Sequence, residues 1–238
     1  MTSRHPTPAT KAVVLGHARC GSGGCYYLLR AAGRDIVHEP FHPSKWEGPW
    51  HAKPYDILAE TDRLLAEHDG YKHLWDHVPL QVNLALCDHL VTAEVPVVHL
   101  RRADRAAQAL SQLLAHATGH WGVECPGERE SYREQVGGLR IDLDELRARI
   151  ENIETGEAAY LERLRPGRLL EVVHEELYTV DVDLRRATAT RVLAHVGLSV
   201  EGADLSSLEP SLKQTTGTLC ATIANIEEIQ RAFGLRLC

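Results

Sequence analysis

The chain has few aromatic residues, a single methionine and no long apolar run. Aromatic side chains make up 5% of its 238 residues, with only two phenylalanines. No stretch reaches the roughly 18 unbroken apolar residues of a membrane-spanning helix, because polar residues such as Asp88, Glu94 and His99 interrupt the longest apolar regions. The sequence therefore predicts no membrane span. Residues 1–10 lack the apolar core of a signal peptide and are expected to form a flexible tail.

An excess of positive charge is also missing. The chain carries 33 acidic and 26 basic residues, which gives a net charge of −7 with histidine neutral. This balance argues against nucleic acid as the partner, while a local basic pocket for one small anion stays compatible with it. Hydrophobic residues at 44% and charged residues at 25% are ordinary for a globular chain, and the length suits one large α/β domain or two small ones.

Several catalytic and metal-binding motifs are absent. The six cysteines are scattered without a CxxC pair, so a disulfide framework is not expected and a reducing cytoplasm is the expected location. The fourteen histidines include the pairs His73 with His77 and His116 with His120, whose i, i+4 spacing predicts shared helix faces. Neither pair lies in an HExxH motif, so no metal site is expected. A GxSxG nucleophile elbow is also missing, which argues against a serine hydrolase.

Strand-like apolar runs alternate with helical stretches along the chain. This alternation predicts a single α/β domain over residues 11–238, with a central parallel β-sheet flanked by helices. Proline-rich residues 35–55 and residues 121–138 predict loops. The predicted strands are residues 11–15, 71–75, 95–100 and 169–173, and the predicted helices are residues 26–32, 57–67, 80–90, 103–116, 142–164 and 183–196.

A glycine-rich segment, GHARCGSGG at residues 16–24, joins the first predicted strand to the first predicted helix. Backbone N–H groups at a helix N-terminus are unpaired and the helix dipole is positive there, so a phosphate or sulfate suits this turn. Arg19 adds a planar cation and Ser22 a hydroxyl donor. A turn that is rich in glycine for steric reasons alone is the alternative. Ser22 and Gly23 stand where a Walker A loop requires Lys and Ser/Thr, which argues against a magnesium-dependent NTPase.

A second motif follows the strand predicted at residues 95–100. It reads RADRAAQALS at residues 102–111, with TGHW at residues 118–121. Arg102 at the end of the strand and Ser111 on the next helix are placed to meet a second phosphate. An arginine-rich helix start is usually a solvated surface. The motif therefore indicates a phosphate site only in combination with the turn at residues 16–24.

Together these segments resemble the sulfotransferases that use 3′-phosphoadenosine 5′-phosphosulfate, most closely the trehalose sulfotransferase-like branch. In that family an R-S-G-S/T turn holds the 5′-phosphosulfate, and an R-x-D-K-x-x-Q-A-x-S stretch holds the 3′-phosphate. The chain has RCGS at residues 19–22 and RADRAAQALS at residues 102–111. GYKHLW at residues 70–75 resembles the family's G-x-K-x-M-W strand, and residues 172–177 and 212–229 resemble its Y-E-x-L element and closing segment. The resemblance covers most of the chain and implies a P-loop-like sulfotransferase fold.

The resemblance also implies a reaction and a set of site residues. The reaction is metal-free transfer of a sulfuryl group from 3′-phosphoadenosine 5′-phosphosulfate to a hydroxyl of a small acceptor, such as a sugar or a secondary metabolite. Glu39 is the first candidate for the base and His38 the second, with Lys72 or Lys213 beside the leaving group. The implied cofactor-binding residues are Arg19, Cys20, Gly21, Ser22, Gly23, Gly24, Arg102, Ser111 and Lys213.

Three departures from the family pattern leave alternatives open. Cys20 replaces a serine, Gly23 a threonine and Arg105 a lysine. The missing hydroxyl at Gly23 removes a donor to the bound anion, so a nucleotide-binding protein without turnover stays an alternative, as does a nucleotide-dependent kinase. The acceptor site is expected in the loops at residues 35–55 and 121–138, where tryptophans are candidates to line it. A homodimer is compatible with the sequence.

Overall fold

The computed structural model describes residues 11–44, 54–121, 126–209 and 217–235. The chain divides into two compact units. The first comprises Met1–Arg101 with Gly156–Glu209, and the second comprises Arg102–Thr155 with Pro210–Cys238. The expected tail at residues 1–10 lies outside the described residues.

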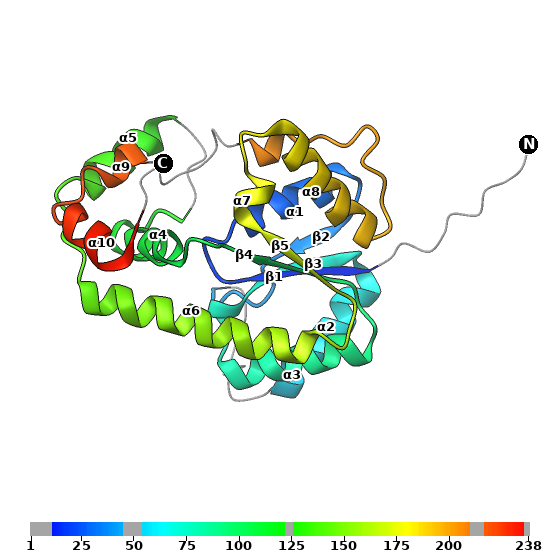
Figure 1. The fold of residues 1–238 in the computed structure, drawn as a ribbon. Helices are drawn as coiled ribbons and strands as arrows, with labels where there is room; N and C mark the ends of the chain where they lie inside the picture. Colours follow the sequence, from blue (N-terminus) through cyan, green and yellow to red (C-terminus); the bar gives the residue numbers. More distant parts are fainter. Residues whose placement is uncertain (1–10, 45–53, 122–125, 210–216, 236–238) are drawn as a thin grey trace, which may run out of the picture. The chain divides into compact units, whose positions relative to one another are not determined.

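The first unit is built around a five-stranded parallel sheet with the order β2-β3-β1-β4-β5 (Figure 1). β1 lies at the centre, with Gly16 opposite Leu74 of β3 and Leu100 of β4. Because the strands are parallel, their carboxyl ends meet at one edge of the sheet, where residues after β1, β2 and β3 come together. The predicted α/β class with a central parallel sheet is confirmed. The strands are β1 Ala12–Gly16, β2 Ile36–His38, β3 Gly70–Leu74, β4 Val97–Arg101 and β5 Leu169–Val173.

Helices cover both faces of this sheet (Figure 1). Alternate residues of a strand point to opposite faces, so Val14 packs in the core with α1 and α8, while Val13 and Leu15 pack in the core with α2 and α3. The helices of the first unit are α1 Ser22–Ala31, α2 Pro54–Glu67, the 3-10 helix η2 Trp75–His77, α3 Leu80–Thr92, α7 His174–Leu177, α8 Val182–His195 and the 3-10 helix η3 Ser206–Leu208.

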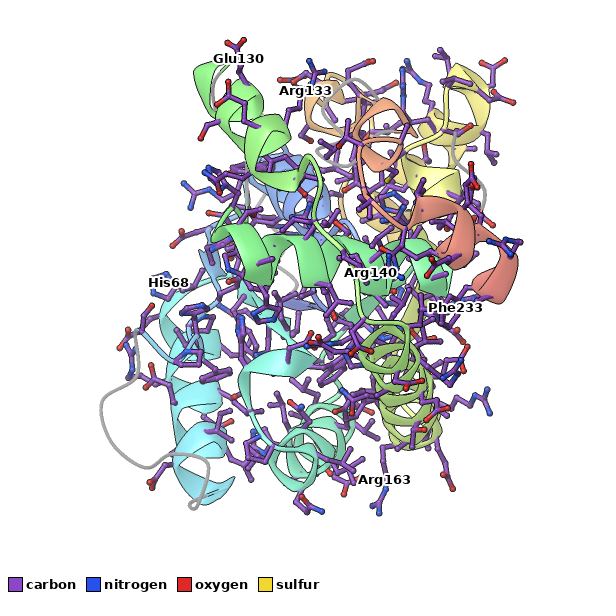
Figure 2. The ribbon with its side chains drawn as sticks, turned by 90° about the vertical axis from the view of Figure 1, so that its left-hand side faces the viewer. His68, Glu130, Arg133, Arg140, Arg163 and Phe233 are labelled. Atoms are coloured by element: carbon purple, nitrogen blue, oxygen red, sulfur yellow. The ribbon has the colours of Figure 1, made fainter. Side chains whose placement is uncertain are left out.

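The second unit is helical and has a core of its own. Leu110, Leu146 and Ile229 are among the buried residues of this core. On its surface Arg140 forms an ion pair with Glu228 at 2.9 Å; Arg140 is labelled in Figure 2. Its helices are α4 Arg105–Thr118, α5 Pro126–Val136, the first part of α6 Leu143–Leu164, α9 Gly217–Cys220 and α10 Ile226–Phe233.

Two predicted loops contain regular structure. β2 lies within residues 35–55, because the short β-branched run Ile36–His38 pairs with β3 at the edge of the sheet, where only one neighbour is needed. α5 lies within residues 121–138 and packs Tyr132 and Val136 into the core of the second unit. In both cases tertiary pairing outweighs the local turn-forming composition.

The expected shared helix faces of the histidine pairs are wrong. His73 lies on β3 and His77 ends the 3-10 helix that follows it, so the two side chains belong to different elements. His116 lies on α4, but this helix ends at Thr118, before His120, with Gly119 in a left-handed conformation at φ 72°. The i, i+4 spacing predicts a shared face only when one helix runs through both positions.

None of the helices in the described ranges combines the length and hydropathy needed to cross a bilayer. The four cysteines within these ranges, Cys20, Cys25, Cys87 and Cys220, are free and buried.

We expect Asn83→Ala to destabilise the first unit. Asn83 is fully buried on α3, its Nδ2 donates to the Trp75 carbonyl at 2.8 Å, and its Oδ1 lies 3.0 Å from Nε2 of His73. Without Asn83, the buried Trp75 carbonyl and the His73 ring lose their hydrogen-bond partners, so the free energy of unfolding should fall by about 3 kcal/mol. Urea unfolding measures this, with the exposed Gln81→Ala on the same helix as control. Equal stability of the two variants would contradict the structural role of Asn83.

Candidate functional site

The turn after β1 leads directly into α1. Arg19 at φ 64° and Gly21 at φ 90° both have left-handed backbone conformations, and Gly21 is the N-cap of α1. Gly21 has no side chain with which to cap this helix, and no acidic residue lies in its first turn. The Ser22 N–H bonds the Cys20 side chain, and the N–H groups of Gly24 and Cys25 bond the Tyr178 hydroxyl. The helix dipole favours negative charge at this end of α1.

Two side chains from the segment after β5 anchor the carbonyl groups of this turn. His174 Nδ1 lies 3.1 Å from the Cys20 carbonyl, and the Tyr178 hydroxyl donates a short hydrogen bond to the Gly21 carbonyl. In a trans peptide the C=O and the following N–H point in opposite directions. Anchoring these two carbonyls therefore directs the N–H groups of Gly21 and Ser22 away from His174 and Tyr178.

The glycines of the turn differ in what surrounds them. A Cβ at Gly16 would come within 2.6 Å of Cys20 Sγ and the Leu100 carbonyl, and a Cβ at Gly21 would come within 2.6 Å of His174 and Tyr178. Gly24 is similarly crowded by Tyr178. Gly23 is the exception, because a Cβ there meets nothing within 4 Å. Close packing thus requires three of these glycines, whereas Gly23 faces open space.

The start of the turn is held by a carboxylate from the 3-10 helix η2, which follows β3. The Ala18 N–H donates to Asp76 Oδ2 at 2.6 Å, and His17 Nδ1 lies 3.4 Å from the same carboxylate. Partial burial by itself raises the pKa of Asp76, but the hydrogen bonds from His17 and Ala18 outweigh it and the pKa lies below its usual range. Asp76 is therefore ionised at neutral pH and fixes the turn to the neighbouring strand.

Cys20 is a structural residue of the turn. Its side chain is fully buried in the core beneath α1, and burial raises the pKa of its thiol to about 11. A thiol with such a pKa is neutral and unreactive at physiological pH. The Cys20 Sγ lies next to Gly16, inside the protein. A role of Cys20 in ligand binding would therefore involve its backbone and not its thiol.

Glu39 lies just after β2 and forms a short ion pair with Lys72 of β3. Both side chains are largely buried, with 14% and 5% of their surface exposed. Burial raises the pKa of Glu39, but the Lys72 ammonium outweighs this effect and the pKa lies below its usual range. The carboxylate is therefore ionised and able to accept a proton.

Glu39 also has a left-handed backbone conformation, with φ 47°. Glu39 and Arg19 are two of the few described non-glycine residues with positive φ, and this conformation often occurs at functional sites.

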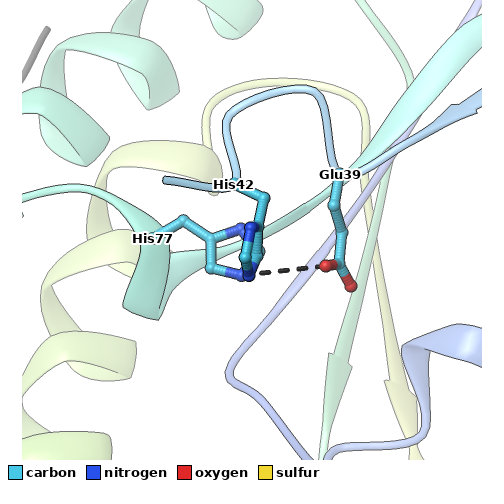
Figure 3. A group of neighbouring side chains, drawn as sticks. All are labelled: Glu39, His42 and His77. Carbon is cyan, nitrogen blue, oxygen red and sulfur yellow. Dashed lines mark ion pairs between the residues drawn. The ribbon is translucent and has the colours of Figure 1, made fainter. Parts of the chain in front are cut away.

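Three histidines surround this carboxylate. His38 Nε2 lies 3.7 Å from Glu39 Oε1 and 3.3 Å from Lys72 Nζ, so the second candidate for the base lies beside the first. On the other side, His77 Nε2 lies 3.8 Å from Glu39 Oε2 (Figure 3). Burial lowers the pKa of His77 to about 3, which keeps its imidazole neutral. His42 packs edge-on against His77, with ring centres 4.7 Å apart.

The second predicted motif lies in the other unit. Arg102 is the first residue after β4, and Ser111 is buried on α4. The N-terminus of α4 is capped by Asp104, whose carboxylate accepts from the Ala107 N–H at 2.8 Å. This helix therefore has part of its first turn satisfied by its own cap. The TGHW segment ends in Trp121, which is 47% exposed and lies edge-on to His116.

Some predicted site residues lie outside the described ranges, and two residues that contact the turn were not predicted from the sequence. Lys213 and the tryptophans Trp46 and Trp50 are outside. Tyr178 and Asp76 were not predicted, because each meets the turn from a distant part of the chain. The family resemblance at residues 172–177 and the lysine-containing strand at residues 70–75 were the nearby signals.

Comparison with family models of known proteins found no match, and comparison with curated proteins found no significant match. Among solved structures, the chain is similar to a sulfotransferase from Alicyclobacillus acidocaldarius. The two share 15% sequence identity with a TM-score of 0.47, and the alignment covers 97% of this chain and 98% of the other.

We expect Glu39→Gln to change how stability responds to acid. The pKa of Glu39 is lowered in the folded state from its ordinary value of 4.5, so ionised Glu39 stabilises the fold above that value and this contribution is lost as the pH falls below it. Between about pH 6 and about pH 3.5, the wild type should lose stability more steeply than the variant. Urea unfolding across this range measures the difference. Glu94→Gln is the matched control, because Glu94 is an exposed glutamate that also has positive φ. Parallel curves for wild type and Glu39→Gln would contradict the ion pair.

Proposed function

We propose that this protein is a sulfotransferase that moves a sulfuryl group from 3′-phosphoadenosine 5′-phosphosulfate to a hydroxyl of a small acceptor. The observation that carries the proposal is the turn after β1. Its carbonyls are anchored by His174 and Tyr178, and it leads into the N-terminus of α1, where the helix dipole favours an anion. Such a turn suits a bound phosphosulfate.

The first motif would hold the 5′-phosphosulfate. The N–H group of Gly21 would supply a hydrogen bond, and Arg19 would supply a permanent charge in the same turn. The open space at Gly23 lies where the resembled family has a threonine, so this chain would bind the donor with one hydroxyl fewer. Each hydrogen bond to a charged group is worth about 1.5–3 kcal/mol, so the remaining donors carry more of the affinity.

Glu39 would act as the general base. As the acceptor oxygen bonds to sulfur, its proton passes to Glu39, while the bond from sulfur to the 5′-phosphate oxygen breaks and the leaving bisphosphate keeps the electron pair. Lys72 has two functions in this scheme. It keeps Glu39 ionised, and its ammonium can offset negative charge that develops on the leaving phosphate. His38 remains the second candidate for the base because it touches the same pair.

The second motif would hold the 3′-phosphate through Arg102 and Ser111. This assignment follows the family resemblance. The acceptor would be a small hydroxyl compound, and the proposed chemistry needs no metal. A kinase is disfavoured because the turn has no lysine followed by Ser or Thr to bind ATP with magnesium.

A nucleotide-binding protein without turnover is the second candidate function. It is favoured by one observation, which is that Glu39 is tied to Lys72 and has a lowered pKa, so it is a weaker base than a free carboxylate.

We expect Glu39→Gln to lower the rate of sulfuryl transfer by about 10²–10⁴-fold, because the amide cannot accept the acceptor proton. Transfer is measured with 3′-phosphoadenosine 5′-[³⁵S]phosphosulfate and a panel of sugars and phenols. Affinity for adenosine 3′,5′-bisphosphate should change little, since Glu39 is not part of the turn, and Glu94→Gln should behave as the wild type. A wild type that binds the nucleotide but transfers to no acceptor would favour the binding protein. Full activity of Glu39→Gln would exclude Glu39 as the base.

A further inference from the structure

Three side chains with metal-ligating atoms meet beside the carboxyl edge of the sheet (Figure 3). Glu39 and His42 come from the segment after β2, and His77 ends the 3-10 helix after β3. One ligand atom from each residue lies within 4.8 Å of the others, and all three residues are partly exposed. An ion from solvent could therefore reach these three side chains without unfolding of the hydrophobic core around the sheet.

Neighbouring groups orient two of these three side chains, Glu39 and His42. Oε1 of Glu39 is held by Lys72, which leaves Oε2 facing His77 at 3.8 Å. Nδ1 of His42 accepts from the Ser44 N–H at 3.2 Å and lies 2.7 Å from the Ser44 hydroxyl, so Ser44 fixes the orientation of this ring. Outer hydrogen bonds of this kind orient metal-binding carboxylates and imidazoles. Lys72 and Ser44 thus hold two of the three candidate ligands in place.

The donor set selects the class of ion. Two imidazole nitrogens and one carboxylate oxygen suit Zn²⁺ and its neighbours among the first-row transition metals, whereas Mg²⁺ and Ca²⁺ prefer oxygen ligands. Ligands on a tetrahedral zinc lie roughly 3.3 Å apart at bond lengths of about 2.0–2.1 Å. The Glu39–His77 separation of 3.8 Å needs a contraction of about 0.5 Å to reach this geometry, which side-chain rotation can supply.

We propose that Glu39, His42 and His77 form a binding site for one divalent transition-metal ion of the zinc class, with its remaining coordination positions open to solvent. The Lys72 ammonium next to Oε1 repels a cation, so the affinity should be lower than that of a site without a neighbouring cation. The ion would occupy Oε2 of Glu39 and so exclude an acceptor hydroxyl from that oxygen. Binding of the metal does not depend on the proposed transfer reaction, and it is measured on the protein alone.

The test uses the full chain prepared without a histidine tag, titrated with ZnCl₂ in a calorimeter and with CoCl₂ under visible absorption. The wild type should bind one ion at this site, with the Co²⁺ absorption bands of a nitrogen- and oxygen-ligated ion. His42→Ala, His77→Ala and Glu39→Gln should each weaken binding at least about 10-fold, the loss typical of a removed ligand or supporting group.

His89→Ala is the matched control. His89 lies on α3 and pairs with a carboxylate, Asp62 at 2.7 Å, but it is not a member of the cluster. Its substitution should leave both titrations unchanged, and thermal unfolding checks that all variants fold. A wild type that binds neither ion at submillimolar concentration would overturn the proposal. Binding that survives unchanged in His42→Ala and His77→Ala, both folded, would overturn it as well.

Discussion

The candidate site depends on the fixed orientation of a few peptide groups in the turn after β1. His174 and Tyr178 bond the carbonyls of Cys20 and Gly21 on one side, and Asp76 bonds the N–H of Ala18 at the start of the turn. These bonds connect the turn to the segments that follow β5 and β3. The N-terminus of α1 is therefore held in place by contacts to two other segments, which a flexible glycine-rich loop would lack.

The parallel sheet explains why separate motifs meet. β2, β3 and β1 are neighbours, and their carboxyl ends bring together Glu39, Lys72 and the turn. Lys72 lies on the middle one of these three strands, and its charge acts on Glu39 and also on the Cys20 thiol. One buried ammonium thus keeps a carboxylate ionised next to the turn. The same carboxylate has a second oxygen that faces His77, and this oxygen is the basis of the proposed metal site.

Sequence patterns predicted the parts of this structure that depend on neighbours along the chain. The strand, glycine-rich turn and helix at residues 11–31 are present, and Glu39 and Arg19 both have the positive φ that sets them apart from ordinary loop residues. Patterns of this kind could not predict contacts between distant segments. β2 depends on pairing with β3, and the anchors His174 and Tyr178 reach the turn from more than 150 residues away. The grouping of His42 with His77 arises because β2 and β3 are adjacent, which no spacing in the sequence reveals.

We propose that the turn after β1 binds the 5′-phosphate end of a nucleotide, and the family resemblance assigns the 3′-phosphate to Arg102. Calorimetric titration with adenosine 3′,5′-bisphosphate and with adenosine 5′-monophosphate tests it most directly. Arg19→Ala should weaken both ligands by about 10–100-fold, whereas Arg102→Ala should weaken only the bisphosphate, toward the affinity of the monophosphate. Equal affinity of the bisphosphate for the wild type and both variants would contradict the account.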